Sequence, residues 1–448
     1  MEVDVAILGA GPAGSALAAL LSCNPLTKSL RIALVDTCHP AAVPSELPPH
    51  SDPRVSALSP ASIELLRTVG AWRALAPAAA PVCDVQVWGS GGSGHVRCSA
   101  ASVGSSVVAC VLETQLLVAA LQRRLRAAAA AGGGNGLRLL LPAAPAGAEL
   151  PPYSPQAQLE GGPLTRVRLE GGGTLQARLL VGADGACGSL VRRWAQIRTL
   201  GPGPGSQAEA VELAATVATA WPLQTAFQRF LPTGPLTLLP ARNGAAVQWG
   251  CPPQMAHHLA GLPPHELASA INDALRAPPH PPAAAPLTSL LGGFFEGPRS
   301  SRFVEPPAVV DVIGAPVTRR LVEQHAGGLG RYVRPRVALI GGAAHAAHPL
   351  AGLAGHNLSL ADAKALAKAI ATAVEAGQDI GSAALLEERH ERPRRRTNGA
   401  MLAAADSLRR LLQPQAGPLS SLGSLGLDVM SALPAAKQTL MRLAMHGA

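Results

Sequence analysis

A strand, a glycine-rich turn and a helix open the chain, and this combination limits its possible folds most strongly. The apolar run Val3–Leu8 predicts a buried strand, and the alanine- and leucine-rich segment Ser15–Leu21 predicts a helix. Gly9, Gly11 and Gly14 stand between them. In this setting Gly9 permits a tight turn, Gly11 lets the backbone approach a pyrophosphate, and Gly14 lets the helix pack close to the strand. Phosphates would then lie at the positive end of the helix dipole.

The second predicted strand ends in an acidic residue at the spacing that a dinucleotide site requires. Ile32–Val35 is a short apolar run, and Asp36 follows it, 22 residues after Gly14. A carboxylate at this place typically binds a ribose hydroxyl. A glycine-rich turn without a ligand is the alternative interpretation. The order of strand, glycines, helix, strand and acid favours a dinucleotide-binding site.

The composition sets the size and class of the protein. With 448 residues, 48% of them apolar, the chain is long enough for two domains, although much of the apolar content is alanine. The net charge of +9 suits an anionic membrane or nucleic acid, but we find no nucleic-acid motif and expect a solvated basic surface. The seven cysteines lack metal-ligand spacing, which predicts reduced thiols in an intracellular protein and no metal site.

Neither a transmembrane helix nor a targeting peptide is expected. Every long apolar stretch is broken by proline or polar residues, so none is suited to span a bilayer. The first predicted strand begins at residue 3, which leaves no room before it for a signal or transit peptide.

The middle of the chain changes from helical patterns to short strands separated by turns. A helix is predicted over Glu113–Ala131, and the low-complexity residues 142–163 predict a disordered insertion. Thr165–Leu169 and Thr174–Arg178 predict a hairpin. Residues 210–335 have the pattern of an antiparallel sheet with one or two helices, inserted into the dinucleotide-binding domain.

Two later stretches place glycine or acidic residues at the ends of predicted strands. The first is the buried strand Leu179–Gly182, which is followed by Asp184 and Gly185. The second is Val337–Ile340, followed by Gly341–Gly342 and a proline- and glycine-rich loop that enters a helix. Doubly wound sheets bind ligands at the carboxyl ends of their strands, so both stretches are candidate ligand contacts. For the first stretch an ordinary turn is an equally good interpretation.

These three stretches, in this order and separation, resemble the flavin-dependent aromatic hydroxylases related to para-hydroxybenzoate hydroxylase. Three further segments, Arg54–Ser59, Gln228–Pro235 and Tyr332–Val337, are similar to the ubiquinone-biosynthesis monooxygenases within that group. The resemblance covers nearly the whole chain apart from low-complexity insertions near 128–160 and 278–286.

The resemblance implies an α/β fold. We expect a Rossmann-like FAD-binding domain of the GR2, or para-hydroxybenzoate-hydroxylase, type, with an inserted antiparallel β-sheet substrate domain and a C-terminal helical segment. The expected ranges are 1–80, 110–200 and 335–385 for the FAD-binding domain, 81–109 and 201–334 for the substrate domain, and 386–448 for the C-terminal helical region.

The resemblance also implies roles for individual residues. The three glycines of the first turn would hold the FAD pyrophosphate, and Asp36 would bind the adenosine ribose. Arg54 would contact the flavin side of the cofactor, and Asp184 would lie near both FAD and the electron-donor route. The proline-rich loop would face the isoalloxazine ring, where the helix start favours negative charge on the reduced flavin. The expected cofactor-binding residues are Gly9, Gly11, Gly14, Asp36, Arg54, Asp184, Gly185, Gly341, Gly342 and Asn357, and the flavin-facing loop carries Pro349, Leu350, Gly352 and Gly355.

Family members use reduced FAD and molecular oxygen to form a hydroperoxyflavin, which hydroxylates an electron-rich phenolic ring. The resemblance therefore implies hydroxylation, at C5, of a polyprenylated 4-hydroxybenzoate-type intermediate of ubiquinone biosynthesis, without a nucleophilic side chain. It implies NAD(P)H or a ferredoxin and ferredoxin reductase as electron donor. It also implies a complex with other ubiquinone-biosynthesis proteins and a peripheral place on the matrix side of the mitochondrial inner membrane. The donor, ring position, prenyl length and oligomeric state stay open.

The chain departs from the family pattern beside the flavin. Gly342 stands where the family has aspartate, and the loop Pro349–Asn357 is one residue longer and lacks a glutamine. A lost charged hydrogen bond would weaken FAD binding about ten- to a hundredfold. Two alternatives follow: a non-catalytic homologue that serves as a scaffold in the biosynthetic complex, or a soluble phenol or salicylate hydroxylase. The variant Gly342→Asp is expected to retain much more FAD if the site has decayed.

Several charged or titratable residues have a structural role as their default interpretation. We interpret His345 and His348 as structural rather than acid–base residues. The cluster Arg392–Arg396 is interpreted as a solvated helix face, with contact to an anionic membrane or partner as the alternative. Glu113 precedes a predicted helix, where a packing or capping role is as well supported as a functional one.

Overall fold

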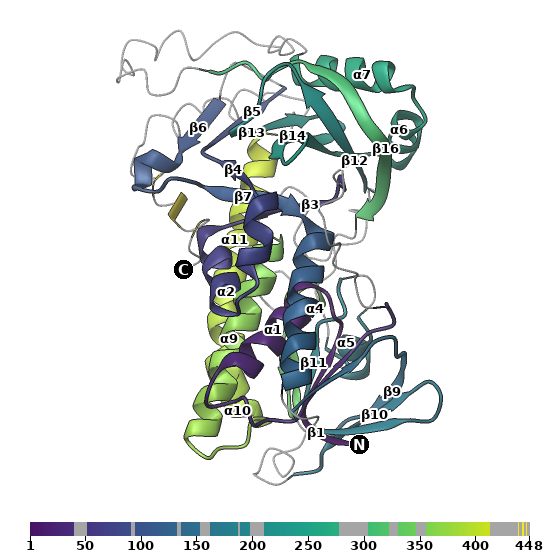
Figure 1. Cartoon of the computed structure of the whole chain (residues 1–448), viewed down its shortest axis with the longest axis vertical. Helices are drawn as coiled ribbons and strands as arrows, with labels where there is room; N and C mark the ends of the chain where they lie inside the picture. Colours follow the sequence, from purple (N-terminus) through teal and green to yellow (C-terminus); the bar gives the residue numbers. More distant parts are fainter. Residues whose placement is uncertain are drawn as a thin grey trace.

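Two large sheets, stacked along the long axis of the molecule, form the two halves of the fold (Figure 1). The lower half contains the first strand, β1 (Glu2–Leu8), and the upper half contains a second sheet with its own helices. The long helices α9 (Gly355–Glu375) and α11 (Arg392–Leu412) run side by side along the same axis. The computed structural model describes residues 1–39, 52–90, 95–131, 136–152, 162–186, 189–197, 210–276, 303–321, 330–345 and 355–412, together with 438, 441, 442 and 445.

The lower half is built on an eight-stranded sheet with a parallel centre. Its main order is β17-β18-β11-β1-β2-β8, and β10 and β9 extend it from β11 by antiparallel pairing. The central strands are apolar and buried on both faces, as is usual in parallel sheets. Besides β1, the strands are β2 (Ile32–Val35), β8 (Leu137–Leu140), β9 (Pro145–Glu149), β10 (Thr165–Leu169), β11 (Thr174–Gly182), β17 (Val333–Arg334) and β18 (Val337–Leu339).

The carboxyl ends of the four central strands lie level with one another. Leu8 of β1 pairs with Val35 of β2 on one side and with Gly182 of β11 on the other. Gly182 in turn pairs with Leu339 of β18. The glycine-rich turn, the acidic residue after β2 and the turns after β11 and β18 therefore meet at one edge of the sheet.

Helices with small apolar residues cover this sheet. α1 (Pro12–Cys23) follows the glycine-rich turn and packs closely against α9 and α4 (Thr114–Ala131), which its alanines allow. α9 carries the predicted apolar stripe on its buried face. The remaining helical elements of this half are α5 (Leu190–Trp194), η4 (Gly341–Ala343), α10 (Ala383–Leu386) and the π-helical turn η6 (Glu387–Glu391), which leads into α11.

A small three-stranded sheet, in the order β3-β7-β4, lies between the two larger sheets (Figure 1). Ser59 caps the helix that follows β3 by accepting a hydrogen bond from the Ser62 backbone amide. The elements of this region are β3 (Val55–Leu58), α2 (Pro60–Thr68), α3 (Trp72–Leu75), η1 (Ala76–Ala78), β4 (Ala80–Val82), η2 (Ala100–Val103) and β7 (Ala109–Glu113).

The upper half is a seven-stranded sheet in the order β16-β12-β15-β14-β13-β5-β6. All its neighbours pair antiparallel, as predicted, except β5 and β13, which are parallel. Two amphipathic helices, α6 (Pro253–Ala260) and α7 (Pro264–Arg276), pack against this sheet and close its own core. The strands are β5 (Asp84–Gly89), β6 (His95–Ser99), β12 (Ala210–Thr219), β13 (Thr225–Leu231), β14 (Gly234–Ala241), β15 (Gly244–Cys251) and β16 (Val309–Leu321).

The structure confirms one local prediction and corrects another. The predicted hairpin is present, because β10 and β11 pair antiparallel around the glycines at 171–173. The prediction of disorder over 142–163 was wrong in part, because β9 forms within it and pairs with β10. Residues 153–161 of that stretch and 278–286 lie outside the described residues. Among the helices of the described residues, none combines the length and apolar character needed to cross a bilayer.

Candidate functional site

The first turn has the close packing that its glycines predict. Gly9 has a φ of +110°, and an added Cβ there would collide with the Ala183 carbonyl. A Cβ on Gly14 would collide with the carbonyl oxygen of Gly9. A Cβ on Gly11, in contrast, would meet no atom within 4 Å. Glycine is therefore required at positions 9 and 14 by close packing within the protein. Gly11 instead borders open space where a ligand could approach.

Asp36 is held beside this turn by backbone hydrogen bonds. Its Oδ2 atom accepts from the Ala10 amide at 2.6 Å, and Oδ1 accepts from the Cys38 amide at 2.9 Å. The Ala10 carbonyl in turn accepts from Ser15 Oγ at 2.8 Å and from Gln122 Nε2 at 3.2 Å. The carboxylate and the glycine-rich turn are thus fixed relative to each other, which is the arrangement predicted from their spacing.

Alanine substitutions at Gly14 and Gly11 should separate packing from ligand binding. Gly14→Ala is expected to destabilise the fold by about 1–3 kcal/mol, because the new methyl group overlaps the Gly9 carbonyl. Gly11→Ala is expected to leave the unfolding midpoint unchanged and to weaken FAD binding. Urea denaturation and FAD titration of both purified variants check this. Equal losses of stability in the two variants would contradict it.

Asp184 caps a helix. Its Oδ1 accepts from Ser189 Oγ at 2.6 Å, and its Oδ2 accepts from the Leu190 amide at 2.6 Å. Gly185, next to it, has a φ of +82° and open space where a Cβ would point. The carboxylate thus organises the start of α5, and the neighbouring glycine presents backbone to the open side.

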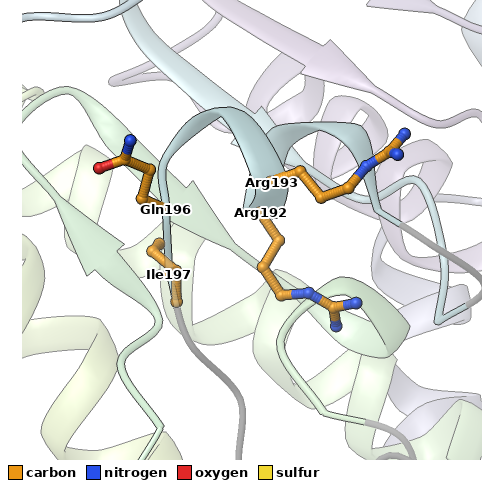
Figure 2. A pocket seen from close by; sticks show the side chains of 4 residues that line it. All are labelled: Arg192, Arg193, Gln196 and Ile197. Atoms are coloured by element: carbon orange, nitrogen blue, oxygen red, sulfur yellow. The ribbon is translucent and has the colours of Figure 1, made fainter.

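A cavity of about 460 Å³ lies beside α5. It is lined by Arg192 and Arg193 of the helix and by Gln196 and Ile197 after it. Figure 2 shows the two arginine side chains leaving the helix in different directions. Burial lowers the pKa of Arg192, and the Asp184 charge opposes this shift. The lining carries positive charge and attracts anions.

The turn after β18 presses against the turn after β11. Gly341 has a φ of +58° and lies against Ala13 and Ser359, at the starts of α1 and α9. A Cβ on Gly342 would lie 2.8 Å from the Ala186 amide nitrogen. The position where the family resemblance leads us to expect an aspartate side chain is therefore next to backbone here.

Asn357 ties the first turn of α9 to the small sheet. Its Oδ1 accepts from the Ser59 amide at 2.9 Å and from Ser62 Oγ at 2.7 Å, and its Nδ2 donates to the Ala57 carbonyl at 2.9 Å. Gly355 is the first residue of α9. The loop residues expected to face the flavin, Pro349, Leu350 and Gly352, lie outside the described residues, as does His348.

A buried cluster behind the turn after β18 was not predicted from the sequence. Asp362 of α9 accepts from the Gly341 amide at 3.0 Å, from Arg394 Nε at 2.7 Å and from Asn398 Nδ2 at 3.0 Å. Its Oδ2 also lies 2.7 Å from His345 Nε2. Burial alone would raise the pKa of Asp362, but the neighbouring charges outweigh burial and hold it well below its usual value.

This cluster corrects the interpretation of the basic C-terminal segment. Arg394 is buried, so the prediction that Arg392–Arg396 forms a solvated face was wrong at this position. His345 is buried in the same cluster, which agrees with the structural role predicted for it. The sequence carried a signal that we did not use. Asp362 stands four residues before Leu366, on the apolar stripe of α9, and Asn398 follows Arg394 by one helical turn.

Two ion pairs join the site to its surroundings. Arg54 is exposed and pairs with Asp52, with Nε 2.9 Å from Oδ1, at the entry to β3. Glu113, at the end of β7, lies 3.1 Å from Arg242 of the upper half and is buried. The pair links the small sheet to the seven-stranded sheet, so Glu113 has a packing role.

The residues at the edge of the parallel sheet fit a dinucleotide such as FAD. Gly11 borders open space, and the N-terminus of α1 has no side-chain cap, which leaves its amide groups for a phosphate. Asp36 lies beside the same turn at the place of a ribose ligand. No group of His, Cys, Asp and Glu in the described part of the chain is suited to hold a metal.

Comparisons with known proteins of similar sequence or structure agree with a site for FAD. No protein-family profile matches the chain. It is 31% identical over 454 residues to ubiquinone biosynthesis monooxygenase COQ6, mitochondrial, of Mus musculus, covering 98% of this chain and 90% of the relative. It is 31% identical over 445 residues to ubiquinone hydroxylase UbiL of Rhodospirillum rubrum, covering 99% and 89%.

Solved structures share the fold at lower identity. PqsL, a probable FAD-dependent monooxygenase from Pseudomonas aeruginosa, matches with a TM-score of 0.65 and 19% identity over 95% of this chain and 99% of its own. Klebsiella pneumoniae HpxO, solved with FAD and uric acid, matches with a TM-score of 0.62 and 17% identity over 99% and 97%. The chain has the fold of the flavin-dependent monooxygenases, and by its identity to the curated relatives it belongs to the family of ubiquinone biosynthesis monooxygenases.

Proposed function

We propose that this protein is an FAD-dependent monooxygenase that hydroxylates the aromatic ring of a polyprenylated 4-hydroxybenzoate-type intermediate, at C5. The observation that carries the proposal is the convergence of the glycine-rich turn, Asp36 and the starts of α1 and α9 at one edge of the parallel sheet, directly below a second sheet. The family membership supplies the substrate class.

The chain's own residues would bind and orient the reactants. The turn Gly9–Gly14 and the start of α1 would hold the pyrophosphate, and Asp36 would bind the ribose. The backbone at Gly185 and Gly341–Gly342 would lie along the cofactor, and Asn357 would fix the helix start near the flavin ring. Reduced FAD would supply the electrons that activate molecular oxygen. The protein would contribute orientation, exclusion of water and stabilisation of charge.

The partners and location of this chain belong to the same proposal. The electron donor would be NAD(P)H or a ferredoxin and ferredoxin reductase pair, and other ubiquinone-biosynthesis proteins would form a complex with it. The Mus musculus relative is named mitochondrial, which supports a mitochondrial location. Within the mitochondrion, the proposed place is the matrix side of the inner membrane. A prenylated substrate stays in the bilayer, so the protein would attach peripherally to reach it.

Turnover with labelled oxygen tests the proposal. The purified protein with FAD, 3-prenyl-4-hydroxybenzoate and either donor system is expected to give a product heavier by one oxygen atom, and ¹⁸O₂ is expected to label it. Consumption of reductant without a hydroxylated product, under both donor systems, would overturn the activity. Rapid substrate-stimulated NADH oxidation without a redox partner, together with turnover of simple phenols, would instead favour a soluble phenol or salicylate hydroxylase.

A scaffold without catalytic activity is the second candidate, because Gly342 replaces the family's aspartate. The visible absorption spectrum of the purified protein, before and after soaking with FAD, separates the two. A tightly held flavin spectrum supports the monooxygenase. A protein that stays colourless after soaking supports the scaffold.

A further inference from the structure

His356 stands at the start of α9 with its side chain directed at the small sheet. Its Nδ1 atom lies 3.0 Å from Ser56 Oγ of β3. Ser56 Oγ lies 2.7 Å from Thr114 Oγ1, at the start of α4. The imidazole is therefore one end of a short chain of hydrogen-bonding groups that links α9 to β3 and to the start of α4.

Groups from β3 and from the upper sheet surround the start of α9, where His356 lies. The next residue, Asn357, binds the β3–α2 connection. The charge of Arg319, on β16 of the upper sheet, acts on the imidazole. Arg319 pairs with Glu212 of β12 at 2.9 Å. His356 thus lies at the contact between α9 and the small sheet, near enough to the seven-stranded sheet for the Arg319 charge to act on it.

The imidazole is neutral at physiological pH. Burial, and to a smaller degree the charge of Arg319, lowers the pKa of His356 to about 4. The positive end of the α9 dipole acts in the same direction. A neutral imidazole carries one N–H and one lone pair. Ser56 Oγ can accept from an Nδ1–H or donate to a bare Nδ1.

Within the described part of the chain, His356 Nε2 makes no hydrogen bond, and its side chain is only partly buried. If Nδ1–H donates to Ser56 and Ser56 donates to Thr114, Nε2 presents a bare lone pair. Such a group selects for a ligand with a hydrogen-bond donor.

We propose that His356 is a substrate-binding residue whose Nε2 accepts a hydrogen bond from the ring hydroxyl of the aromatic substrate. The inference rests on the proposed function and adds the group that recognises the phenol. Ser56 and Thr114 are positioning residues that keep the proton on Nδ1. An acceptor at Nε2 would distinguish a phenol, which can donate a hydrogen bond, from its methyl ether, which cannot.

Paired ligands measure this discrimination directly. The FAD-loaded protein is titrated with 3-prenyl-4-hydroxybenzoate and with its 4-methyl ether, and binding is followed by the change in flavin absorbance. Wild-type protein is expected to bind the phenol about tenfold more tightly, the value of one good hydrogen bond. His356→Phe is expected to bind both ligands with the weaker affinity. The control is His265→Phe, the same change at an exposed histidine of α7, which should keep the wild-type preference.

Nitrogen NMR of the wild-type imidazole gives a second test that needs neither turnover nor a stable variant. The proposal predicts a protonated Nδ1 and a bare Nε2 in the free protein, with the Nε2 resonance moving when the phenol is added and not when the ether is added. Protonation at Nε2, or a preference for the phenol that survives in His356→Phe, would overturn the inference while leaving the proposed function intact. Failure of the wild-type protein to bind either ligand would overturn both.

Discussion

Replacing Asp362 by alanine is expected to lower the free energy of unfolding by about 3–5 kcal/mol, the usual cost of removing one partner from a buried ion pair. The carboxylate is completely buried and is the common acceptor for the Gly341 amide, the Arg394 guanidinium and the Asn398 amide. Without it the Arg394 charge stays in the interior with Asn398 as its remaining partner in this cluster. Typical domains have only about 5–15 kcal/mol of stability, so the loss is large.

Asp362→Ala is also expected to disturb the cofactor site. Asp362 binds the Gly341 amide, and Gly341 lies against the first turns of α1 and α9. The variant is therefore expected to bind FAD more weakly even at temperatures where it remains folded. Urea denaturation and FAD titration measure the two effects separately.

The pH dependence of this contribution follows from the direction of the pKa shift. The pKa of Asp362 in the folded protein is below its ordinary value of 3.8. A carboxylate with a lowered pKa contributes its full stabilisation above the unfolded value, and the contribution is lost as the pH falls through the folded value. The part of the difference between wild type and Asp362→Ala that comes from this shift is therefore expected to shrink as the pH falls below 3.8.

The matched control is Asp273→Ala, the same change at an exposed position of α7. It is expected to change the free energy of unfolding by no more than about 0.5 kcal/mol. A loss below 1 kcal/mol in Asp362→Ala would contradict the role assigned to the buried cluster.

Local sequence patterns predicted the parts of the site that depend on neighbours in the chain. The strand, glycine-rich turn and helix around Gly9–Gly14 were predictable because each glycine answers a backbone requirement within a few residues. Asp36 was predictable from a spacing. The cap at Ser59 was predictable from its own sequence. These features need no knowledge of distant contacts.

Contacts between distant segments were not predictable in the same way. Asp362 and Arg394 are 32 residues apart and meet only because α9 and α11 pack side by side. Arg394 was interpreted as part of a solvated helix face, and Asp362 was not singled out. The hydrogen bonds of Asp184 to Ser189 and Leu190 were likewise not predicted, because they form only when α5 folds back toward it. The parallel pairing of β5 with β13 depends on the same kind of long-range closure.

Gly342→Asp is expected to weaken FAD binding instead of restoring it. The family pattern alone predicts a gain, because the aspartate would add an acceptor for the cofactor. The structure opposes this: a Cβ at position 342 would lie 2.8 Å from the Ala186 nitrogen and 3.1 Å from the Gly185 carbonyl carbon. Both are backbone atoms that cannot rotate away. Inserting a side chain must move the turn after β11, at an expected cost of about 1–3 kcal/mol.

Gly342→Ala distinguishes the steric effect from the effect of the carboxylate. If the crowding dominates, both variants unfold at lower urea concentration and bind FAD roughly tenfold more weakly, and the aspartate gives no advantage over alanine. Gly261→Ala is the control, because a Cβ there meets its nearest neighbours at 3.6 Å, an ordinary contact distance.

The opposite result has an equally definite meaning. In that case Gly342→Asp binds FAD more tightly than both wild type and Gly342→Ala. That result would mean that the turn after β11 moves to make room for the side chain, and that the lack of the carboxylate limits FAD affinity in the wild-type protein. The site would then be a weakened version of the family's, and the scaffold candidate would gain support. If Gly342→Asp and Gly342→Ala weaken FAD binding equally, the backbone of residues 185–186 occupies the space that an aspartate side chain would need. In that case the cofactor must be held by the glycine-rich turn, Asp36 and the helix starts.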